Sequence, residues 1–505
     1  MTNENKPAAS KGSQYATLAA ALLGWMFDGF EMGLFPLIGK PALKDLLTDQ
    51  AQSDRWFGVI MAVFLVGAAS GGVLFGWLGD KIGRVRAMSL SILTYALFTG
   101  LCGFATEAWH IAVLRFIASL GMGGEWSLGV ALVNEIWPGK SRAFIAGLIG
   151  AASNVGFLLV ALLSIGLTQV IGSVESVLLA IGVPQATTTE LLQNSAWRFL
   201  MISGAFPAFL IFFIRLFVPE SAKWEEEKAS GNTSNWSNID LGGVLIGCLA
   251  AIGIIYVWSP AAAGIPTTVS IIVTVVGLIV ALCGFLFPVR QYLQRTVASG
   301  ALSQEAGSKV ISRMMLGASL AGIALLGTWG SLQWAPRWAG ELKPDTATEK
   351  FYAAPLTQGA TAMGAIVSTI LAAMAAGRFG RRRTYCILCV GSFLSAVYFY
   401  RFHDKFDASF LFAAFLAGGV TASFYGFFPL YFPELFPTAV RATGQGFSFN
   451  FGRIIAAIGG LQTANLMTFF GNSFPKAGSL LAGIYLVGVF VIWLGPETKG
   501  QELPE

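Results

Sequence analysis

The residue with the clearest chemical potential in this sequence is Asp28, a carboxylate inside an apolar segment over residues 16–38. A charged side chain near the centre of a bilayer costs about 2.5 to 3.5 kcal/mol on insertion scales, so such a residue is seldom kept without a use. A buried carboxyl group can hold or release a proton as its surroundings change. We therefore predict that Asp28 carries a proton across a membrane.

Arg115 is the expected partner of Asp28. At 1.5 Å per residue, Asp28 lies about 15 Å and Arg115 about 9 Å below the outer ends of their predicted helices, a difference of about one turn. The two side chains can therefore meet, and the arginine would favour the ionised carboxylate. The alternative is a static ion pair that only fixes the packing of two helices.

A second deep charge is Arg453, which lies about 18 Å beyond Arg441, a marker of the membrane surface. The planar guanidinium group of arginine suits a carboxylate, which it binds through two parallel hydrogen bonds. We predict that Arg453 holds the acid group of a substrate, assisted by three polar residues: Asn450, Gln445 and Gln333. The alternative is an ion pair between Arg453 and another buried acid, Glu125 or Glu31.

Two further acids fall within predicted membrane segments. Glu31 lies three residues after Asp28 on the same helix face, where it is either a second protonation site or part of an outer vestibule. Glu125 lies about 24 Å down the fourth predicted helix, where a gating or second-proton role competes with a capping role. The sequence has no metal-ligand spacing, nucleophile triad or phosphate-binding glycine loop, so we expect neither a cofactor nor an enzyme.

Long apolar segments position these residues. Of the 505 residues, 55% are hydrophobic and only 12% are charged, too few to coat a water-soluble globule of this size. A helix needs about 20 apolar residues to cross the hydrocarbon core. We predict an all-α membrane protein with fourteen transmembrane helices, near residues 16–38, 56–79, 87–105, 109–135, 143–169, 197–218, 241–260, 267–288, 312–335, 355–377, 384–402, 409–432, 443–469 and 478–494.

Charge asymmetry predicts the orientation of these helices. Lys and Arg are more frequent in the loops on the side of the N-terminus than in the opposite loops, which places both termini in the cytoplasm. No basic run with interleaved aromatic residues suggests nucleic acid. The predicted divisions are a cytoplasmic tail at 1–14, a six-helix bundle at 15–220, a linker with an inserted transmembrane hairpin at 221–310, a second six-helix bundle at 311–495 and a cytoplasmic tail at 496–505.

An internal repeat indicates two related halves. The motif from Glu135 to Arg142 recurs with the same spacing from Glu434 to Arg441. The loop Gly76-Trp-Leu-Gly-Asp80-Lys81-Ile-Gly83-Arg84 has a weaker counterpart that starts at Gly377. The apolar segments 241–260 and 267–288 fall between the halves. We interpret them as an inserted hairpin, because an even number of extra spans keeps the two halves parallel.

These paired motifs resemble those of the major facilitator superfamily. Within that superfamily, Leu23-Gly24-x-x-x-Asp28-Gly29-Phe30-Glu31 and the run from Arg115 to Glu125 are similar to the sialate:proton symporter branch, which is related to carriers of lactate, aromatic acids and nicotinate. The resemblance implies two six-helix bundles that rock around a central site to give alternating access.

The resemblance also implies that Asp80 and Arg84 latch the cytoplasmic ends of the two halves in the outward-facing state. We place the other charged residues of the paired motifs in the same latch: Lys81, Glu135, Arg142, Glu434 and Arg441. Gly377 stands where Asp80 would map in the second half, so only the first loop is expected to act as the latch. The alternative is a solvated loop whose positive charge only sets the topology.

The sequence therefore favours a proton-coupled symporter, a functional monomer in the cell inner membrane that imports a small organic anion such as sialic acid, lactate or another carboxylate. A proton-coupled sugar or polyol porter is the first alternative. Hexose porters carry a glutamine-rich stretch on the seventh helix, whereas this chain has Gly330-Ser-Leu-Gln-Trp334 there. The second alternative is a non-transporting membrane sensor on the same fold.

Overall fold

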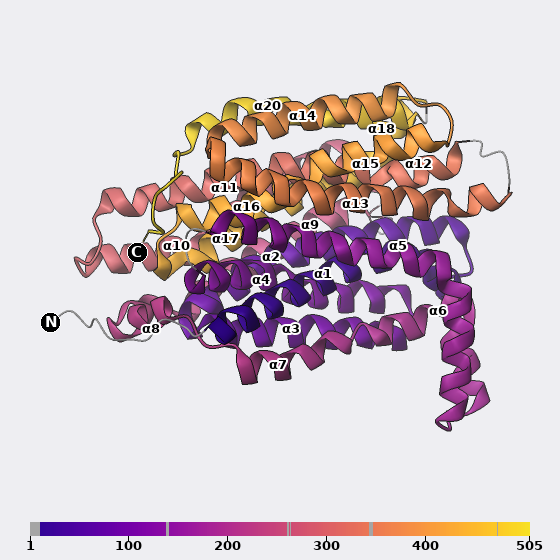
Figure 1. Ribbon diagram of the computed structural model, residues 1–505, viewed down its shortest axis with the longest axis horizontal. Coiled ribbons are helices and arrows are strands. Elements are labelled where there is room, and N and C mark those ends of the chain that lie inside the picture. Colours follow the sequence, from indigo (N-terminus) through magenta and orange to yellow (C-terminus); the bar gives the residue numbers. More distant parts are fainter. Residues whose placement is uncertain are drawn as a thin grey trace.

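The computed structural model describes residues 11–137, 141–259, 262, 264–342, 347–471 and 473–504. Within these ranges the chain forms α-helices, short 3-10 helices and turns, with no strand, which confirms the predicted all-α class. The N-terminal half consists of α1 (Lys11–Leu46), α2 (Gln50–Ile82), α3 (Arg84–Leu101), α4 (Ala108–Ile136), α5 (Arg142–Ala180), α6 (Gln185–Ser203) and α7 (Leu210–Phe217) (Figure 1).

A linker with α8 (Ala222–Ala229), α9 (Leu241–Val257) and α10 (Thr267–Ala298) leads to the C-terminal half. That half consists of α11 (Gln304–Gly330), α12 (Ala335–Glu341), α13 (Ala347–Phe379), α14 (Arg381–Arg401), α15 (Ala408–Ala422), α16 (Phe424–Tyr431), α17 (Arg441–Asn450), α18 (Gly452–Phe469), α19 (Phe474–Ala482) and α20 (Ile484–Val491). The start of α1, helix α8 and the C-terminal segment lie at one end of the bundle, which we call the terminal end, and α6 lies at the other (Figure 1).

Twelve helical stretches of the described chain are long and apolar enough to cross a membrane. They include α9 and α10 at the positions predicted for the hairpin, but they do not include the predicted spans 197–218 and 443–469. The first of these is divided by a 3-10 turn, η3 (Phe206–Phe209), that contains a proline. The second is divided at Phe451, where Gly452 packs closely against α11.

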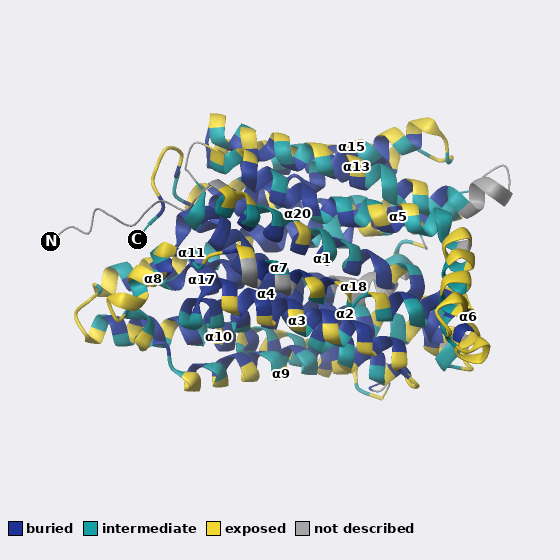
Figure 2. Cartoon of the chain, turned by 60° about the horizontal axis from the view of Figure 1, so that its bottom comes forward, coloured by how far each residue is buried: buried dark blue, intermediate teal, exposed yellow. Residues whose placement is uncertain are grey.

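Small residues allow the two halves to approach closely. A Cβ atom added to Gly446 of α17 would lie only 2.2 Å from the carbonyl oxygen of Gly72 of α2. Only glycine fits so near a neighbouring backbone, as is common where membrane helices pack together. Buried residues fill the interior of the bundle, and exposed residues concentrate on its outer faces and on α6 (Figure 2). The halves are therefore in direct contact around the polar groups described below.

Helices α9 and α10, at the positions predicted for the hairpin, are anchored at the terminal end. Asp240 accepts two hydrogen bonds from Arg295, at 2.6 and 2.8 Å, and Trp236 stacks on the ring of Tyr292 with centroids 4.3 Å apart. The indole nitrogen of Trp236 also donates to the carbonyl oxygen of Ala439, in the C-terminal half. The segment that precedes α9 therefore ties the hairpin to the polar region between the halves.

Candidate functional site: a central charge cluster and two terminal-end networks

Asp80 connects the two halves at the terminal end. It lies in the last turn of α2, and its carboxylate accepts hydrogen bonds from the backbone nitrogens of Ala442 (3.2 Å) and Thr443 (2.8 Å) and from the Thr443 hydroxyl (2.6 Å). These donors belong to the first turn of α17, where free backbone N–H groups and the helix dipole favour an anion. An acid of one half thus caps a helix of the other.

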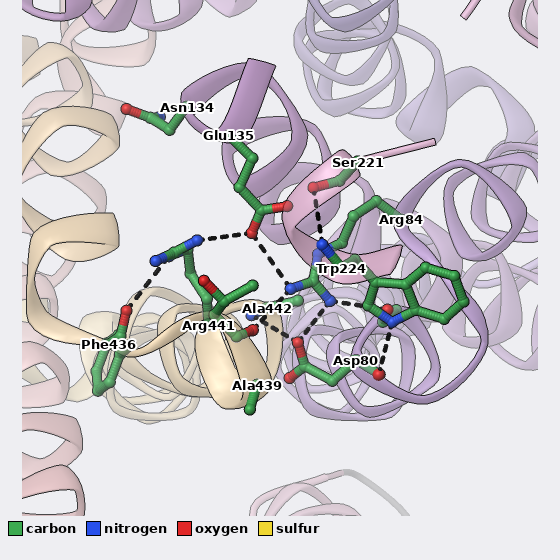
Figure 3. A network of polar contacts seen from close by, with 12 residues as sticks. Asp80, Arg84, Asn134, Glu135, Ser221, Trp224, Phe436, Ala439, Arg441 and Ala442 are labelled. Carbon is green, nitrogen blue, oxygen red and sulfur yellow. Dashed lines mark hydrogen bonds and ion pairs between the residues drawn. The ribbon is translucent and has the colours of Figure 1, made fainter. Parts of the chain in front are cut away.

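Arg84 extends this contact into a chain of alternating charges (Figure 3). Its guanidinium group is fully buried and binds Asp80 at 2.6 Å and Glu135 at 3.3 Å. Glu135 also binds Arg441 of the C-terminal half at 2.8 Å, and Arg441 donates to the carbonyl oxygen of Pro504 at 2.6 Å. We call Asp80, Arg84, Glu135 and Arg441 the first network.

The repeated residues form a second network of Arg381, Glu434 and Arg142. Arg381 binds Glu434 through two nitrogens, at 2.5 and 3.0 Å, and Arg142 of the N-terminal half lies 3.6 Å from the same carboxylate. The hydroxyl of Thr498 donates to Glu434 at 2.6 Å. Both glutamate–arginine pairs of the repeat therefore cross between the halves: Glu135 pairs with Arg441, and Glu434 pairs with Arg142.

Lys81 lies outside both networks. Its ammonium group donates to the side-chain oxygen of Asn238 at 2.5 Å, just before α9, and stands 4.7 Å from the centroid of the Trp77 ring. Lys81 was predicted to belong to the latch. Its side chain contacts the linker and not the opposite half.

Two acids in connecting segments support these networks, and the sequence reasoning missed both. Glu220 accepts hydrogen bonds from the backbone nitrogens of Arg84 and Val85, and Glu497 accepts them from those of Arg381 and Arg382. Burial raises the pKa of Glu220 despite its hydrogen bonds. Burial also opposes ionisation of Glu497, but its backbone hydrogen bonds outweigh that effect and lower its pKa.

A repeated pattern could have revealed these acids. Pro219-Glu-Ser221 follows the first half, and Pro496-Glu-Thr498 follows the second. Next to the first copy, the indole nitrogen of Trp224 donates to the backbone oxygen of Asp80 at 2.9 Å (Figure 3). Both copies return to the start of a helix, α3 or α14, that directly follows a positive-φ glycine, Gly83 or Gly380.

The central cluster consists of Asp28, Glu125 and Arg453. All three side chains are buried, and the carboxyl groups of Asp28 and Glu125 are in hydrogen-bonding contact. Gly24 precedes Asp28 by one turn and makes room for Glu125, because an added Cβ would lie 1.7 Å from the Glu125 Oε1 atom. Arg453 is near enough to Asp28 and Tyr425 for direct electrostatic interaction. One carboxyl oxygen on each acid and the Nη1 atom of Arg453 are buried without a hydrogen-bond partner.

The predicted pairing of Asp28 with Arg115 is wrong. Arg115 binds Glu31 instead, with Nη1 2.7 Å from Oε1, and Thr99 donates to the same oxygen. The guanidinium group also lies 4.7 Å from the centroid of the Phe35 ring. One helical turn separates Asp28 from Glu31, which is the size of the difference in depth on which the prediction relied. The Glu31–Arg115 pair lies within the N-terminal half.

The polar residues predicted around Arg453 lie elsewhere. Gln445 donates to the backbone oxygen of Ser127, and Asn450 donates to that of Gly123 at 3.1 Å, so both join α17 to α4 rather than surrounding Arg453. Gln333 is exposed in the 3-10 turn η7 (Leu332–Trp334) that follows α11. Glu125 and Tyr425 are the polar side chains that accompany Arg453 and Asp28 in their place. Over the described residues, no group of three or more His, Cys, Asp or Glu side chains is arranged to hold a metal ion.

The fold and the paired networks define a membrane carrier of two related halves, and the chain belongs to the Major Facilitator Superfamily. The sequence model of that family matches residues 19–340, and the model described as Sugar (and other) transporter matches residues 348–505. The protein is therefore a multi-pass membrane transporter.

Particular relatives are carriers of organic acids. The chain is 24% identical to the niacin transporter NiaP of Acinetobacter baylyi, over 97% of this chain and 95% of the relative. It is 26% identical to the cis,cis-muconate transport protein of the same organism, over 87% and 84%. It is 29% identical to the sialic acid transporter NanX of Escherichia coli, over 43% and 46%. These relatives agree with the predicted relation to the sialate, aromatic-acid and nicotinate carriers.

A solved structure shares the fold. The proton:xylose symporter XylE, solved with 6-bromo-6-deoxy-D-glucose, superposes with a TM-score of 0.65 at 16% identity and covers 97% of this chain and 98% of its own. At this identity the likeness concerns the arrangement of helices alone.

Proposed function

We propose that the protein is a proton-coupled symporter that imports a small organic anion by alternating access. The observation that carries this proposal is Arg453, a guanidinium group buried between the halves whose Nη1 atom has no hydrogen-bond partner. Among the described residues it has no ion pair within 4.0 Å. A buried guanidinium group with no ion pair and an unused donor is costly, and a carboxylate ligand would supply two hydrogen bonds to it.

Asp28 is the proposed proton carrier, and Glu125 replaces Arg115 as its partner. Two carboxyl groups in contact and shielded from water cannot both ionise at low cost, so they share a proton. Arg453 stabilises the charge that remains. Arrival of an anionic substrate at Arg453 would weaken that stabilisation and favour proton uptake, which couples the two ligands. We place Glu31 outside this exchange because one of its oxygens is held by Arg115.

The terminal end is proposed to face the cytoplasm of a cell with an inner membrane, and the protein to act as a monomer. In this orientation the first network closes the cytoplasmic side, and the hairpin of α9 and α10 adds two spans to the twelve that two six-helix halves provide. The broken stretches α6–α7 and α17–α18 would then complete fourteen crossings.

Uptake into proteoliposomes of the purified chain tests this proposal. With labelled nicotinate and lactate as probes and an inward proton gradient, we expect concentrative uptake that free carboxylates inhibit and neutral sugars do not. Asp28→Asn should abolish uptake driven by the proton gradient and retain counterflow. Arg453→Lys should raise the apparent substrate constant at least tenfold, since lysine cannot bind a carboxylate bidentately.

Arg401→Lys is the matched control, because Arg401 is exposed at the end of α14 and should leave uptake unchanged. Uptake of xylose that carboxylates do not inhibit would replace the proposal with a sugar porter. An absence of flux for carboxylates and sugars alike would favour a sensor. Full proton dependence in Asp28→Asn would remove that residue from the coupling.

A further inference from the structure

Four aromatic rings accompany the three charges of the central cluster. Trp126 of α4 stacks on Phe449 of α17 with ring centroids 3.9 Å apart and an interplanar angle of 16°. Trp25 of α1 lies 5.9 Å from Trp126, and Tyr425 meets Phe449 edge-on at 6.3 Å. Because Trp126 and Phe449 belong to different halves, their stacked faces meet at the surface along which the halves must part.

Three of these rings lie close in the sequence to a charge. Trp25 precedes Asp28 by one turn, Trp126 directly follows Glu125, and Arg453 lies four residues after Phe449, across the break at Phe451. The Arg453 guanidinium carbon is 5.5 Å from the centroid of the Phe449 ring. A ligand that lies against Phe449 therefore has a cation at one edge of its binding surface.

Unpartnered donors point independently to a ligand at these rings. The indole nitrogens of Trp25 and Trp126 are buried without a hydrogen-bond acceptor, as is the Nη1 atom of Arg453. Buried indole N–H groups usually find a partner. Three such donors around one pair of rings leave places for acceptor atoms on a flat ligand.

We propose that the substrate is a planar aromatic carboxylate whose ring enters between Trp126 and Phe449 while its carboxylate binds Arg453. This inference rests on the proposed function and narrows its substrate class. A ring in van der Waals contact on both faces needs the stacked side chains to separate by about 3.5 Å. Rocking of the two halves supplies such a movement at their interface. We expect the acid group to be attached directly to the ring, because the Arg453 guanidinium carbon is only 5.5 Å from the centroid of the Phe449 ring.

Binding of two matched acids to the purified full chain tests this inference. Benzoate and cyclohexanecarboxylate have six-membered rings and the same acid group, but only benzoate is flat. Isothermal titration calorimetry should give at least a tenfold smaller dissociation constant for benzoate. Trp126→Leu and Phe449→Leu should each reduce that preference to less than threefold. Trp109→Leu, an exposed tryptophan of the same helix, is the control and should preserve the preference.

The possible failures are distinguishable. Equal affinity for both acids, with both lost in Arg453→Lys, would overturn the aromatic inference and leave the anion symporter intact. No binding of either acid and no carboxylate-inhibited flux would overturn the proposed function and the inference together. If the leucine variants do not fold, the wild-type ratio and the quenching of tryptophan fluorescence by nicotinate decide the question, and absence of both would contradict the inference.

Discussion

The two terminal-end networks are built from repeated residues, yet they join the halves differently. Asp80 reaches the first turn of α17 and binds the backbone of Ala442 and Thr443. At the repeated position of the second half, Gly377 instead packs against Ala143 in the first turn of α5, where an added Cβ would lie 3.0 Å from the Ala143 Cβ atom. A polar cap in one network thus corresponds to an apolar contact in the other.

The two ion pairs that cross between the halves also differ, with the shorter and more buried pair in the first network. Glu135 and Arg441 are 2.8 Å apart with both side chains fully buried, whereas Arg142 lies 3.6 Å from Glu434 and keeps 15% of its side chain exposed. Surface ion pairs contribute little, but a buried charge that loses its partner is strongly destabilising. We infer that the first network controls how the terminal end opens, and that the second mainly holds the C-terminal half together.

Loss of the acid at position 80 is expected to have the largest effect. Asp80→Asn removes the charge that Arg84 and the α17 amides share, and breaking a buried pair in this way costs about 3 to 5 kcal/mol. We expect the open population at the terminal end to rise at least tenfold and uptake to fall at least tenfold. Double electron–electron resonance between spin labels at the exposed positions Arg86 and Arg383, with the native cysteines replaced, measures the opening.

Asp45→Asn is the matched control for this experiment. Asp45 accepts hydrogen bonds from Asn194, Trp197 and Arg198 near α6, away from the terminal end. That variant should leave the label distances unchanged. Identical distance distributions in Asp80→Asn and the wild type would refute a latch at Asp80.

Replacement of Glu135 or Glu434 by glutamine is expected to have the next largest effect. Glu135→Gln leaves Arg84 and Arg441, both fully buried, with a neutral partner. After Glu434→Gln, Arg381 keeps its hydrogen bond to the Ala376 carbonyl oxygen and Arg142 retains access to water. Uptake should therefore fall about tenfold in Glu135→Gln and only a few-fold in Glu434→Gln. A tenfold loss corresponds to about 1.4 kcal/mol.

Thermal unfolding in detergent should follow the same order, with the lower midpoint for Glu135→Gln. The two variants control for each other because both replace a repeated acid by its neutral isostere. Equal losses in uptake and midpoint would show that the networks carry equal weight.

The sequence predicted which residues gather at the terminal end, because repeated motifs mark equivalent loops of two parallel halves. It also placed Asp28 and Arg453 deep in the bundle by counting along apolar helices. Counting residues along the helices could not predict which charged side chains pair with each other. The choice between Asp28 and Glu31 for Arg115 depends on helix rotation and tilt, which shift a side chain by as much as one turn.

The contacts made by connecting segments were also missed. The repeated pattern around Glu220 and Glu497 marks these two acids, but their binding to the starts of α3 and α14 depends on the chain folding back after each half, which no helical periodicity encodes. The break at Phe451 was missed for a related reason, since the apolar run continues through it and only the close packing of Gly452 on α11 marks it.

The smallest expected effect is a pH dependence of opposite sign for Glu220 and Glu497, the acids that support the two networks. The pKa of Glu220 is raised in the folded protein, so its contribution to stability is present below its unfolded pKa, about 4.3, and is lost as the pH rises through the folded value. The pKa of Glu497 is lowered, so its contribution is present above the unfolded pKa and is lost as the pH falls through the folded value.

Melting midpoints of Glu220→Gln and Glu497→Gln, each compared with the wild type from about pH 3.5 to about pH 7, test this contrast. The midpoint of Glu220→Gln relative to the wild type should rise with pH, and that of Glu497→Gln should fall, each by roughly 1 to 3 °C. Glu220 lines a surface hollow of about 460 Å³ together with Arg86 and Trp224, so solvent protons can reach it. Parallel slopes for the two variants would mean that the acids at the starts of α3 and α14 respond alike, and the asymmetry between the networks would then rest on Asp80 and on the crossed ion pairs.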